Sequence, residues 1–177
     1  FGNGFTERDG SCFWDIDYLF EQIMTGLHKA KTAGITECTL GIDTWAVDYV
    51  LLDADGNRIQ EVYAYRDRRT DHAMEEVAKL ISPDTVYAKT GIQQLTFNTL
   101  YQLYTHDNQE LAAADQILMV PDYLYYRLCG RKINESTNAS TTQLLNLQSR
   151  DFDEDLLALL HIKREQFAVL TEPGEVL

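Results

Sequence analysis

The sequence predicts an α/β protein in which helices flank a mixed sheet. Two patterns support this prediction: short apolar runs rich in β-branched and aromatic residues, and longer stretches whose apolar residues recur at helical spacing. The size agrees with it, because 177 residues of which 45% are hydrophobic can build the core of one domain or of part of a larger one. We therefore expect helices packed against a sheet.

The first part of the chain reads as a hairpin, a helix and a group of strands. Turn-forming residues up to Gly10 precede a short apolar strand, which indicates a hairpin. Asp15 or Asp17 can then cap a helix whose apolar side chains recur at helical spacing until Gly34 ends it. The Asp-Ala-Asp-Gly-Asn segment at 53–57 predicts a tight turn rather than a calcium loop, since its glycine comes too early. The expected strands cover residues 11–14, 37–42, 47–53 and 59–65.

The second part of the chain is predominantly helical. Ser82-Pro83 is a strong signal for a helix start, and Gly130 is a signal for a helix end. Acidic residues at 151–155 indicate the solvated, capped start of a further helix, because the helix dipole favours negative charge there. The expected elements are helices over 70–81, 82–87, 100–104 and 121–128, another ending at 160, a strand over 117–120, and loops over 92–98 and 134–142.

The stretch from 39 to 52 is the first candidate for function. Two apolar runs flank a short segment that carries Asp43, Trp45, Ala46 and Asp48. A strand entering a sheet holds whatever follows it rigidly, and a carboxylate beside an indole suits a polyol, whose hydroxyls and C–H faces both need partners. The alternative is a plain hairpin whose two acidic side chains are solvated.

Two further segments allow a functional and a structural interpretation. The loop 92–98 places Phe97 and Asn98 at a helix start, where they can form a pocket wall, or can act as a hydrophobic anchor and an N-cap. The charge cluster 65–69 can contact phosphate, but ion pairs that fix a strand-to-helix corner are the more common role of such a cluster.

Charge and motif content exclude several classes of function. A net charge of -13 without a basic cluster disfavours nucleic acid and anionic membranes as partners, and no apolar run approaches the ~18 residues that span a bilayer. Cys12, Cys38 and Cys129 lie far apart, which favours reduced, buried thiols in a cytoplasmic protein. The histidines lack metal-ligand spacing, and GxSxG, Walker A and GxGxxG are all absent. The catalytic machinery is therefore expected outside these residues.

Most of the chain is covered by short motifs in a fixed order, namely Gly41–Asp48, Ala64–Thr70, Thr90–Gln93, Phe97–Leu103, Met119–Tyr123 with Arg127–Gly130, and Thr137–Gln143. In order and spacing they resemble the FGGY carbohydrate kinases. Any one motif is weak evidence, but six in register are hard to obtain by chance. The first and fourth are most similar to the rhamnulokinase branch, which acts on L-rhamnulose.

The resemblance implies a fold of two actin-like, ribonuclease H-like α/β domains around a cleft. It places residues 1–177 in the first, sugar-side domain, with a phosphate-loop hairpin before Phe1 and the general-base Asp and a nucleotide-binding domain after Leu177. The implied reaction is transfer of the γ-phosphoryl group of ATP to the 1-hydroxyl of L-rhamnulose, with Mg²⁺, in rhamnose breakdown. On this view the chain alone is inactive and binds neither ATP nor metal. The alternatives are another FGGY kinase of the xylulose, fuculose or glycerol type, and a non-enzymatic actin-like binding module.

The resemblance also assigns substrate contacts. The family's sugar-contacting turn falls on Trp45-Ala46-Val47, and Ala46 is the first candidate. Rhamnulokinases often have Gly there, and Ala adds a methyl group where backbone approaches the sugar. Phe97 and Trp45 are expected to line the methyl-bearing side of the sugar, with Asp48 and Asn98 as hydroxyl partners.

Overall fold

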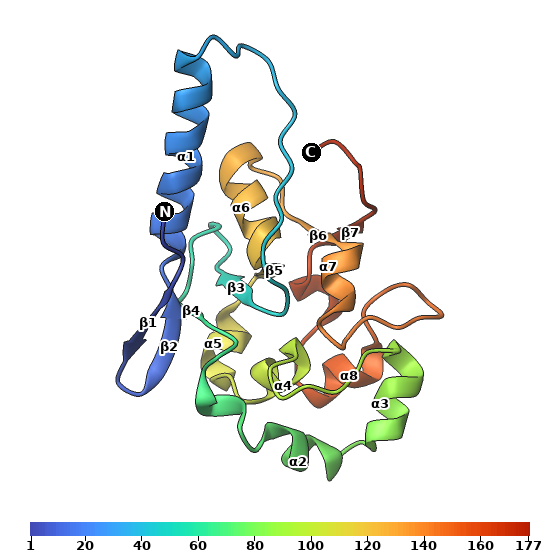
Figure 1. Cartoon of the computed structure of the whole chain (residues 1–177). Helices are drawn as coiled ribbons and strands as arrows, with labels where there is room; N and C mark the ends of the chain where they lie inside the picture. The colour runs from blue at the N-terminus through green and yellow to red at the C-terminus, as the bar shows by residue number, and fades with distance from the viewer.

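The computed structural model describes residues 1–177, and its centre is a two-stranded antiparallel layer (Figure 1). Strand β3 (Tyr49–Leu52) pairs with strand β5 (Gln116–Met119) in a register that sets Tyr49 opposite Met119. Every residue of β3 is buried. Because side chains alternate along a strand, Tyr49 and Leu51 join one apolar cluster and Val50 and Leu52 join another on the opposite face.

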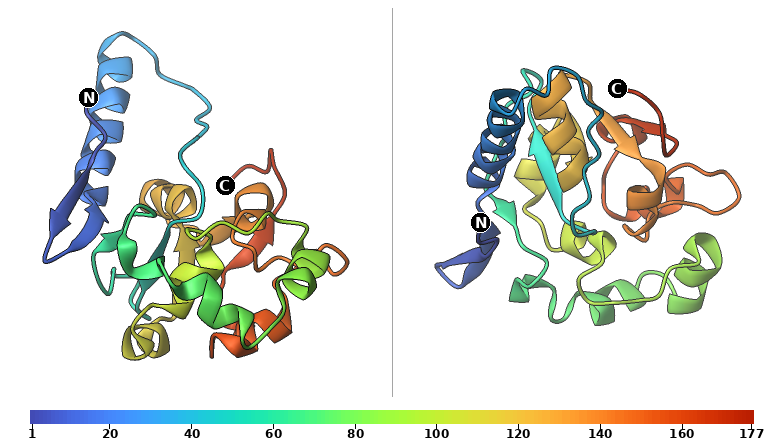
Figure 2. Two further views of the ribbon diagram at one scale, coloured as in Figure 1. Left: turned by 60° about the horizontal axis from the view of Figure 1, so that its bottom comes forward. Right: turned by 45° about the horizontal axis from the view of Figure 1, so that its top comes forward.

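The hairpin and long helix at the N-terminus form one flank of the molecule (Figures 1 and 2). Strands β1 (Phe5–Arg8) and β2 (Ser11–Trp14) pair through a two-residue Asp9-Gly10 turn in which both residues have positive φ. That is the hairpin geometry for which an Asp-Gly pair is suited. Helix α1 (Ile16–Thr32) follows, and the Asp15 side chain accepts a hydrogen bond from its first turn, as predicted. Strand β4 (Val62–Tyr63) adds a third strand beside β2.

Short helices and one more strand pair complete the fold, with α6 on the same face of the central layer as α1 and most of the other helices on the opposite face (Figure 1). In chain order they are η1 (Arg68–Thr70), α2 (Ala73–Ala78), α3 (Pro83–Thr90), α4 (Thr99–Tyr104), α5 (Asn108–Ala113), α6 (Val120–Cys129), β6 (Ile133–Glu135), α7 (Ser136–Ser140), α8 (Glu154–Leu159), η2 (Arg164–Gln166) and β7 (Val169–Thr171). Strands β6 and β7 are parallel, so parallel and antiparallel pairs divide among three small sheets. Ser82 and Gly130 occupy the predicted helix boundaries.

Two predicted segments differ in the structure. Residues 37–42 were expected to be a strand, but they run as an exposed, extended segment whose only hydrogen bond joins Ile42 N to the Tyr125 hydroxyl, at 2.7 Å. A strand exists only as part of a ladder, and no neighbouring strand pairs with this segment. Residues 134–142 were expected to be a loop, but they contain the end of β6 and helix α7. The Glu135 carboxylate caps the first turn of α7.

Smaller corrections concern the length of one strand and the burial of individual side chains. The predicted strand 59–65 is reduced to the two residues of β4. Asp153 caps helix α8 as expected, but it is buried rather than solvated, and Lys89 Nζ lies 2.9 Å from its carboxylate. Cys12 is buried, whereas Cys38 and Cys129 are exposed, because the first is on a core strand and the others are on the extended segment and the last turn of α6.

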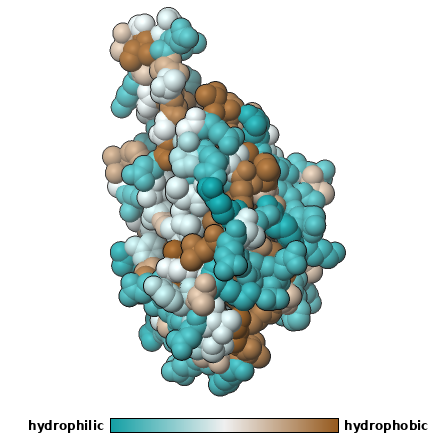
Figure 3. Space-filling view, turned by 90° about the vertical axis from the view of Figure 1, so that its right-hand side faces the viewer, coloured by the Kyte–Doolittle hydropathy of each residue, from teal (hydrophilic) through white to brown (hydrophobic).

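The surface carries no large apolar area on the face shown in Figure 3, where apolar side chains form separate patches between hydrophilic ones. Scattered exposed apolar groups are normal for a folded chain. None of the helices combines the length and the apolar character that crossing a membrane requires.

Candidate functional site

The bend that the sequence singles out is a tight turn centred on Val47. The Asp48 N–H donates to the Ala46 carbonyl at 3.0 Å, and Val47 between them has a φ of 70°. These are the marks of a γ-turn, a strained geometry that β-branched residues seldom adopt. The Val47 carbonyl accepts the Thr99 hydroxyl at 2.7 Å and the Gln102 amide at 3.3 Å, so helix α4 holds the turn. Such strain persists only where the surroundings fix it, and it clusters at ligand sites.

The Asp48 carboxylate lies behind this turn, with 1% of its surface exposed. One oxygen, Oδ2, accepts the indole N–H of Trp14 at 2.6 Å, that of Trp45 at 2.8 Å and the backbone N–H of Tyr65 at 3.1 Å. The other oxygen accepts the Gln102 amide at 2.9 Å. Burial raises the pKa of Asp48, and the four donors oppose that change. The carboxylate therefore fixes two indoles and two chain segments from inside.

Four rings form an aromatic wall beside the turn: Trp14, Trp45, Tyr65 and Phe97. The ring centroids of Trp14 and Trp45 are 4.2 Å apart, those of Trp14 and Tyr65 6.3 Å, and those of Tyr65 and Phe97 5.6 Å. Trp45 and Phe97 are half-buried, so parts of their rings face solvent. The structure thus brings together Trp45, Ala46 and Phe97 through a wall that also contains Trp14 and Tyr65.

Sequence reasoning missed Trp14 and Tyr65 as members of the wall. Both are aromatic residues at the end of an expected strand: Trp14 is the last residue of the hairpin, and Tyr65 is the first residue of the charge cluster. That position is a signal for a site, because strand ends place side chains at the edge of a sheet. The hydrogen bond from the Trp14 indole to Asp48 Oδ2 could not be inferred from the sequence, because the two residues are 34 positions apart.

Asn98 is 2% exposed and precedes helix α4. Its side chain forms no cap, so the simple N-cap alternative is wrong. The Asn98 amide instead donates to the Gln93 carbonyl at 2.8 Å and to the Gln143 side chain at 3.1 Å. These two bonds tie the loop that carries Phe97 to the segment after α7.

The charge cluster at 65–69 has the structural role that was considered the more common one. The Asp67 carboxylate accepts the backbone N–H of Cys12 at 2.7 Å and that of Arg69 at 2.9 Å. The Arg69 guanidinium lies over the Tyr63 ring, 3.9 Å from its centroid, and donates to the Gln102 side-chain oxygen at 3.0 Å. The cluster therefore fixes the corner between β4 and η1 and supports Gln102.

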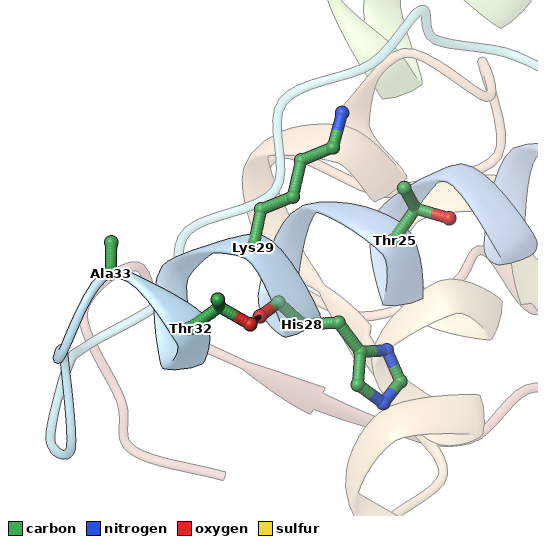
Figure 4. A pocket seen from close by; sticks show the side chains of 5 residues that line it. All are labelled: Thr25, His28, Lys29, Thr32 and Ala33. Carbon is green, nitrogen blue, oxygen red and sulfur yellow. Dashed lines mark hydrogen bonds between the residues drawn. The ribbon is translucent and has the colours of Figure 1, made fainter.

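Two surface hollows lie near α1. One, of about 480 Å³, is lined by Thr25, His28, Lys29, Thr32 and Ala33. Figure 4 shows that all five come from the last turns of α1 and the residue after it, so they cannot surround a ligand. The other, of about 500 Å³, borders the candidate site, because Trp45 lines it together with apolar residues of α1 and the extended segment.

The arrangement offers recognition rather than reaction chemistry. Half-exposed aromatic rings and a small side chain on a rigid turn can contact the C–H faces of a polyol, as the sequence suggested. No group of three or more His, Cys, Asp or Glu side chains is arranged to hold a metal ion.

Comparisons with known proteins point to one family. The model of the FGGY family of carbohydrate kinases, N-terminal domain, matches residues 4–177. A rhamnulokinase of Bacillus subtilis (strain 168) is 53% identical over 174 residues, which cover 98% of this chain and 36% of that protein. A rhamnulokinase of Ligilactobacillus salivarius (strain UCC118) is 48% identical over 177 residues, which cover 100% and 36%. The chain thus spans about a third of the length of these relatives.

Solved structures of sugar kinases have the same fold. A ligand-bound xylulose kinase from Lactobacillus acidophilus matches with a TM-score of 0.83 and 20% identity, covering 100% of this chain and 37% of that one. A gluconate kinase from the same organism matches with a TM-score of 0.84 and 20% identity, covering 99% and 37%. At such identity the likeness concerns the fold alone, which is the expected actin-like α/β fold. The family match over residues 4–177 shows that the chain belongs to the FGGY family of carbohydrate kinases.

Proposed function

We propose that this chain forms the sugar-binding side of an ATP-dependent kinase that phosphorylates the 1-hydroxyl of L-rhamnulose, a step in rhamnose breakdown. The relatives named above as rhamnulokinases support the proposal, because their 48% and 53% identity extends over nearly the whole chain. Residues 1–177 would then be part of the N-terminal domain of a longer, cytoplasmic enzyme. The remaining catalytic parts would lie in other segments of that enzyme.

The observation that carries the proposal is the small Ala46 side chain on a rigid turn that follows Trp45, one of the two half-exposed rings of the aromatic wall. Trp45 precedes Ala46 directly, and Phe97 belongs to the same aromatic wall. L-Rhamnulose is a 6-deoxy ketose, so one end of the molecule is a methyl group that gains from contact with aromatic faces. The methyl group of Ala46 is small enough to let the sugar approach the backbone of the turn.

Hydroxyl recognition by this turn would involve its backbone. The N–H groups of Trp45 and Ala46 donate to no other residue of the chain. Both carboxylate oxygens of Asp48 and the amide nitrogen of Asn98 already have partners, whereas no group of the chain donates to Asn98 Oδ1. We therefore assign sugar oxygens to the two N–H groups. Asp48 would hold the Trp45 indole in place, and Asn98 would hold the Phe97 loop. A direct hydroxyl contact of Asp48 would require it to exchange one of its present partners, whereas Asn98 Oδ1 could accept a hydroxyl without losing one.

The residues of this chain do not fit the role of holding ATP or Mg²⁺. They form no cluster of three or more metal-ligating side chains and contain no glycine-rich phosphate loop. We therefore derive no step through either group. The contribution of the chain would be to bind and orient the ketose, which matters because catalysis of phosphoryl transfer is mostly positioning and electrostatics.

The experiment that tests the proposal is a substrate panel with the complete gene-encoded protein. ADP release would be measured with ATP, Mg²⁺ and either L-rhamnulose, L-fuculose, D-xylulose or glycerol. We expect the highest kcat/KM with L-rhamnulose. A higher value with another sugar would assign the protein to another branch of the family, and no turnover with any of them would favour a non-enzymatic binding module.

A further inference from the structure

Two side chains of helix α4 hold both halves of the candidate site from behind. Thr99 is 0% and Gln102 is 1% exposed, and residues three positions apart share a helix face. The Thr99 hydroxyl donates to the Val47 carbonyl at 2.7 Å, which fixes the strained turn. The Gln102 amide donates to Asp48 Oδ1 and to the Phe97 carbonyl, both at 2.9 Å. We call these two residues the α4 clamp.

The chemistry at Gln102 requires a neutral side chain with both donors and an acceptor. Its nitrogen faces a carboxylate and a carbonyl oxygen, and its oxygen accepts the Arg69 guanidinium at 3.0 Å. These partners fix the amide orientation, because the reversed orientation would set oxygen against oxygen and nitrogen against the guanidinium. A glutamate here would repel the Asp48 carboxylate, and a methionine would leave the buried partners without a hydrogen bond.

We propose that the α4 clamp positions the Ala46 turn relative to Phe97 and thereby sets the affinity of the site for its ketose. The clamp residues themselves are too buried to contact the sugar. They act by linking the bend at 46–48 to the loop that ends at Phe97, since Gln102 binds both segments at once. This inference rests on the proposed function, because it identifies what shapes the same site.

Loss of the clamp should change sugar binding more than any other property. Without the Thr99 hydroxyl, Val47 can relax toward negative φ and carry Ala46 with it. Without the Gln102 amide, the Phe97 loop is free to move relative to Asp48. A displacement of about 1 Å can change catalytic efficiency on the order of 100-fold. We therefore expect the KM for the ketose to rise roughly 10- to 100-fold while the KM for ATP stays within about twofold.

The test compares near-isosteric variants in the complete gene-encoded protein. Thr99→Val replaces the hydroxyl by a methyl group, and Gln102→Met replaces the amide by a thioether. Thr99→Ser keeps the hydroxyl and removes only the methyl group. The matched control is Thr90→Val, because Thr90 is also buried, at 2% exposure. Its hydroxyl donates to the Val86 carbonyl at 2.9 Å and accepts the Ile92 N–H at 3.3 Å, and it makes no hydrogen bond to the turn at 46–48 or to Gln102. Melting temperature, ketose KM and ATP KM would be measured for each.

We expect a raised ketose KM in Thr99→Val and Gln102→Met. The ketose KM of Thr90→Val and of Thr99→Ser should stay close to the wild-type value. The double variant should be less than additive, since both residues hold one geometry. If Gln102→Met does not fold, Thr99→Val decides alone. Wild-type turnover with an unchanged ketose KM in Thr99→Val overturns the clamp and leaves the proposed function intact. No ketose turnover in the wild type overturns both.

Discussion

Replacing Ala46 by leucine should abolish sugar binding and leave the fold nearly unchanged. Ala46 is half-buried on the γ-turn beside Trp45, and leucine adds three carbon atoms at the point proposed for the sugar. The added side chain leaves the carbonyl of Val47 and the carboxylate of Asp48 with all their partners. The structure therefore predicts a loss of ligand affinity without a comparable loss of stability.

The magnitude follows from mass action. A ligand at ~100 times its Kd stabilises the native state by about 2.7 kcal/mol. At ~2–4 °C per kcal/mol for a domain of about 150–250 residues, L-rhamnulose should raise the Tm by roughly 5 to 10 °C. A variant whose Kd has risen ~100-fold keeps only about 0.4 kcal/mol, which is roughly 1 °C.

The assay is thermal unfolding of the complete gene-encoded protein with and without L-rhamnulose, in the absence of ATP. Glu75→Gln is a suitable surface control, because Glu75 is exposed and forms no ion pair or hydrogen bond through its side chain. A full sugar-dependent Tm shift in Ala46→Leu would refute the assignment and leave the bend as a plain structural turn.

Three further predictions concern pH and the isolated chain. Burial and the nearby Arg69 charge lower the pKa of His106 from 6.5 to about 4. As pH falls from about 6.5 to 4, the unfolded chain therefore binds a proton at this residue before the folded chain does, and stability falls. The loss of Tm between pH 7 and 4.5 should be smaller in His106→Gln. Burial raises the pKa of Asp122 from 3.8 to about 8, so the folded state keeps a proton that the unfolded state releases, and stability falls as pH rises through that range. Asp122→Asn should accordingly raise the Tm more at pH 8 than at pH 5, and equal gains would contradict the assignment. The isolated 177-residue chain should release no ADP above background. It should also self-associate, because the extended segment exposes unpaired backbone and the Leu40 side chain, which is 41% exposed, and Ile35 just before the segment is 50% exposed. Light scattering that shows only monomer at high concentration would count against this.

Local structure was predictable where interactions span only a few residues. The Asp15 cap, the Asp9-Gly10 turn and the end of α6 at Gly130 each depend on neighbours within one turn of the chain, and the structure confirms them. The same is true of the candidate bend, because an apolar strand following Trp45-Ala46 is a local pattern. The family could also be inferred, since motif order and spacing are properties of the sequence.

The tertiary structure decided whatever depends on partners distant in sequence. Residues 37–42 have strand composition but no strand beside them, and a ladder needs two strands. Asp48 carries the residue type of a sugar ligand, yet Trp14 and Gln102 reach it from 34 and 54 positions away and occupy its oxygens. The sequence alone thus indicated Trp45, Ala46 and Phe97 as members of the site, but not Trp14 and Tyr65. Only folding determined which of them face solvent and which hold the others in place, because a buried polar atom takes its partners from whatever packs against it.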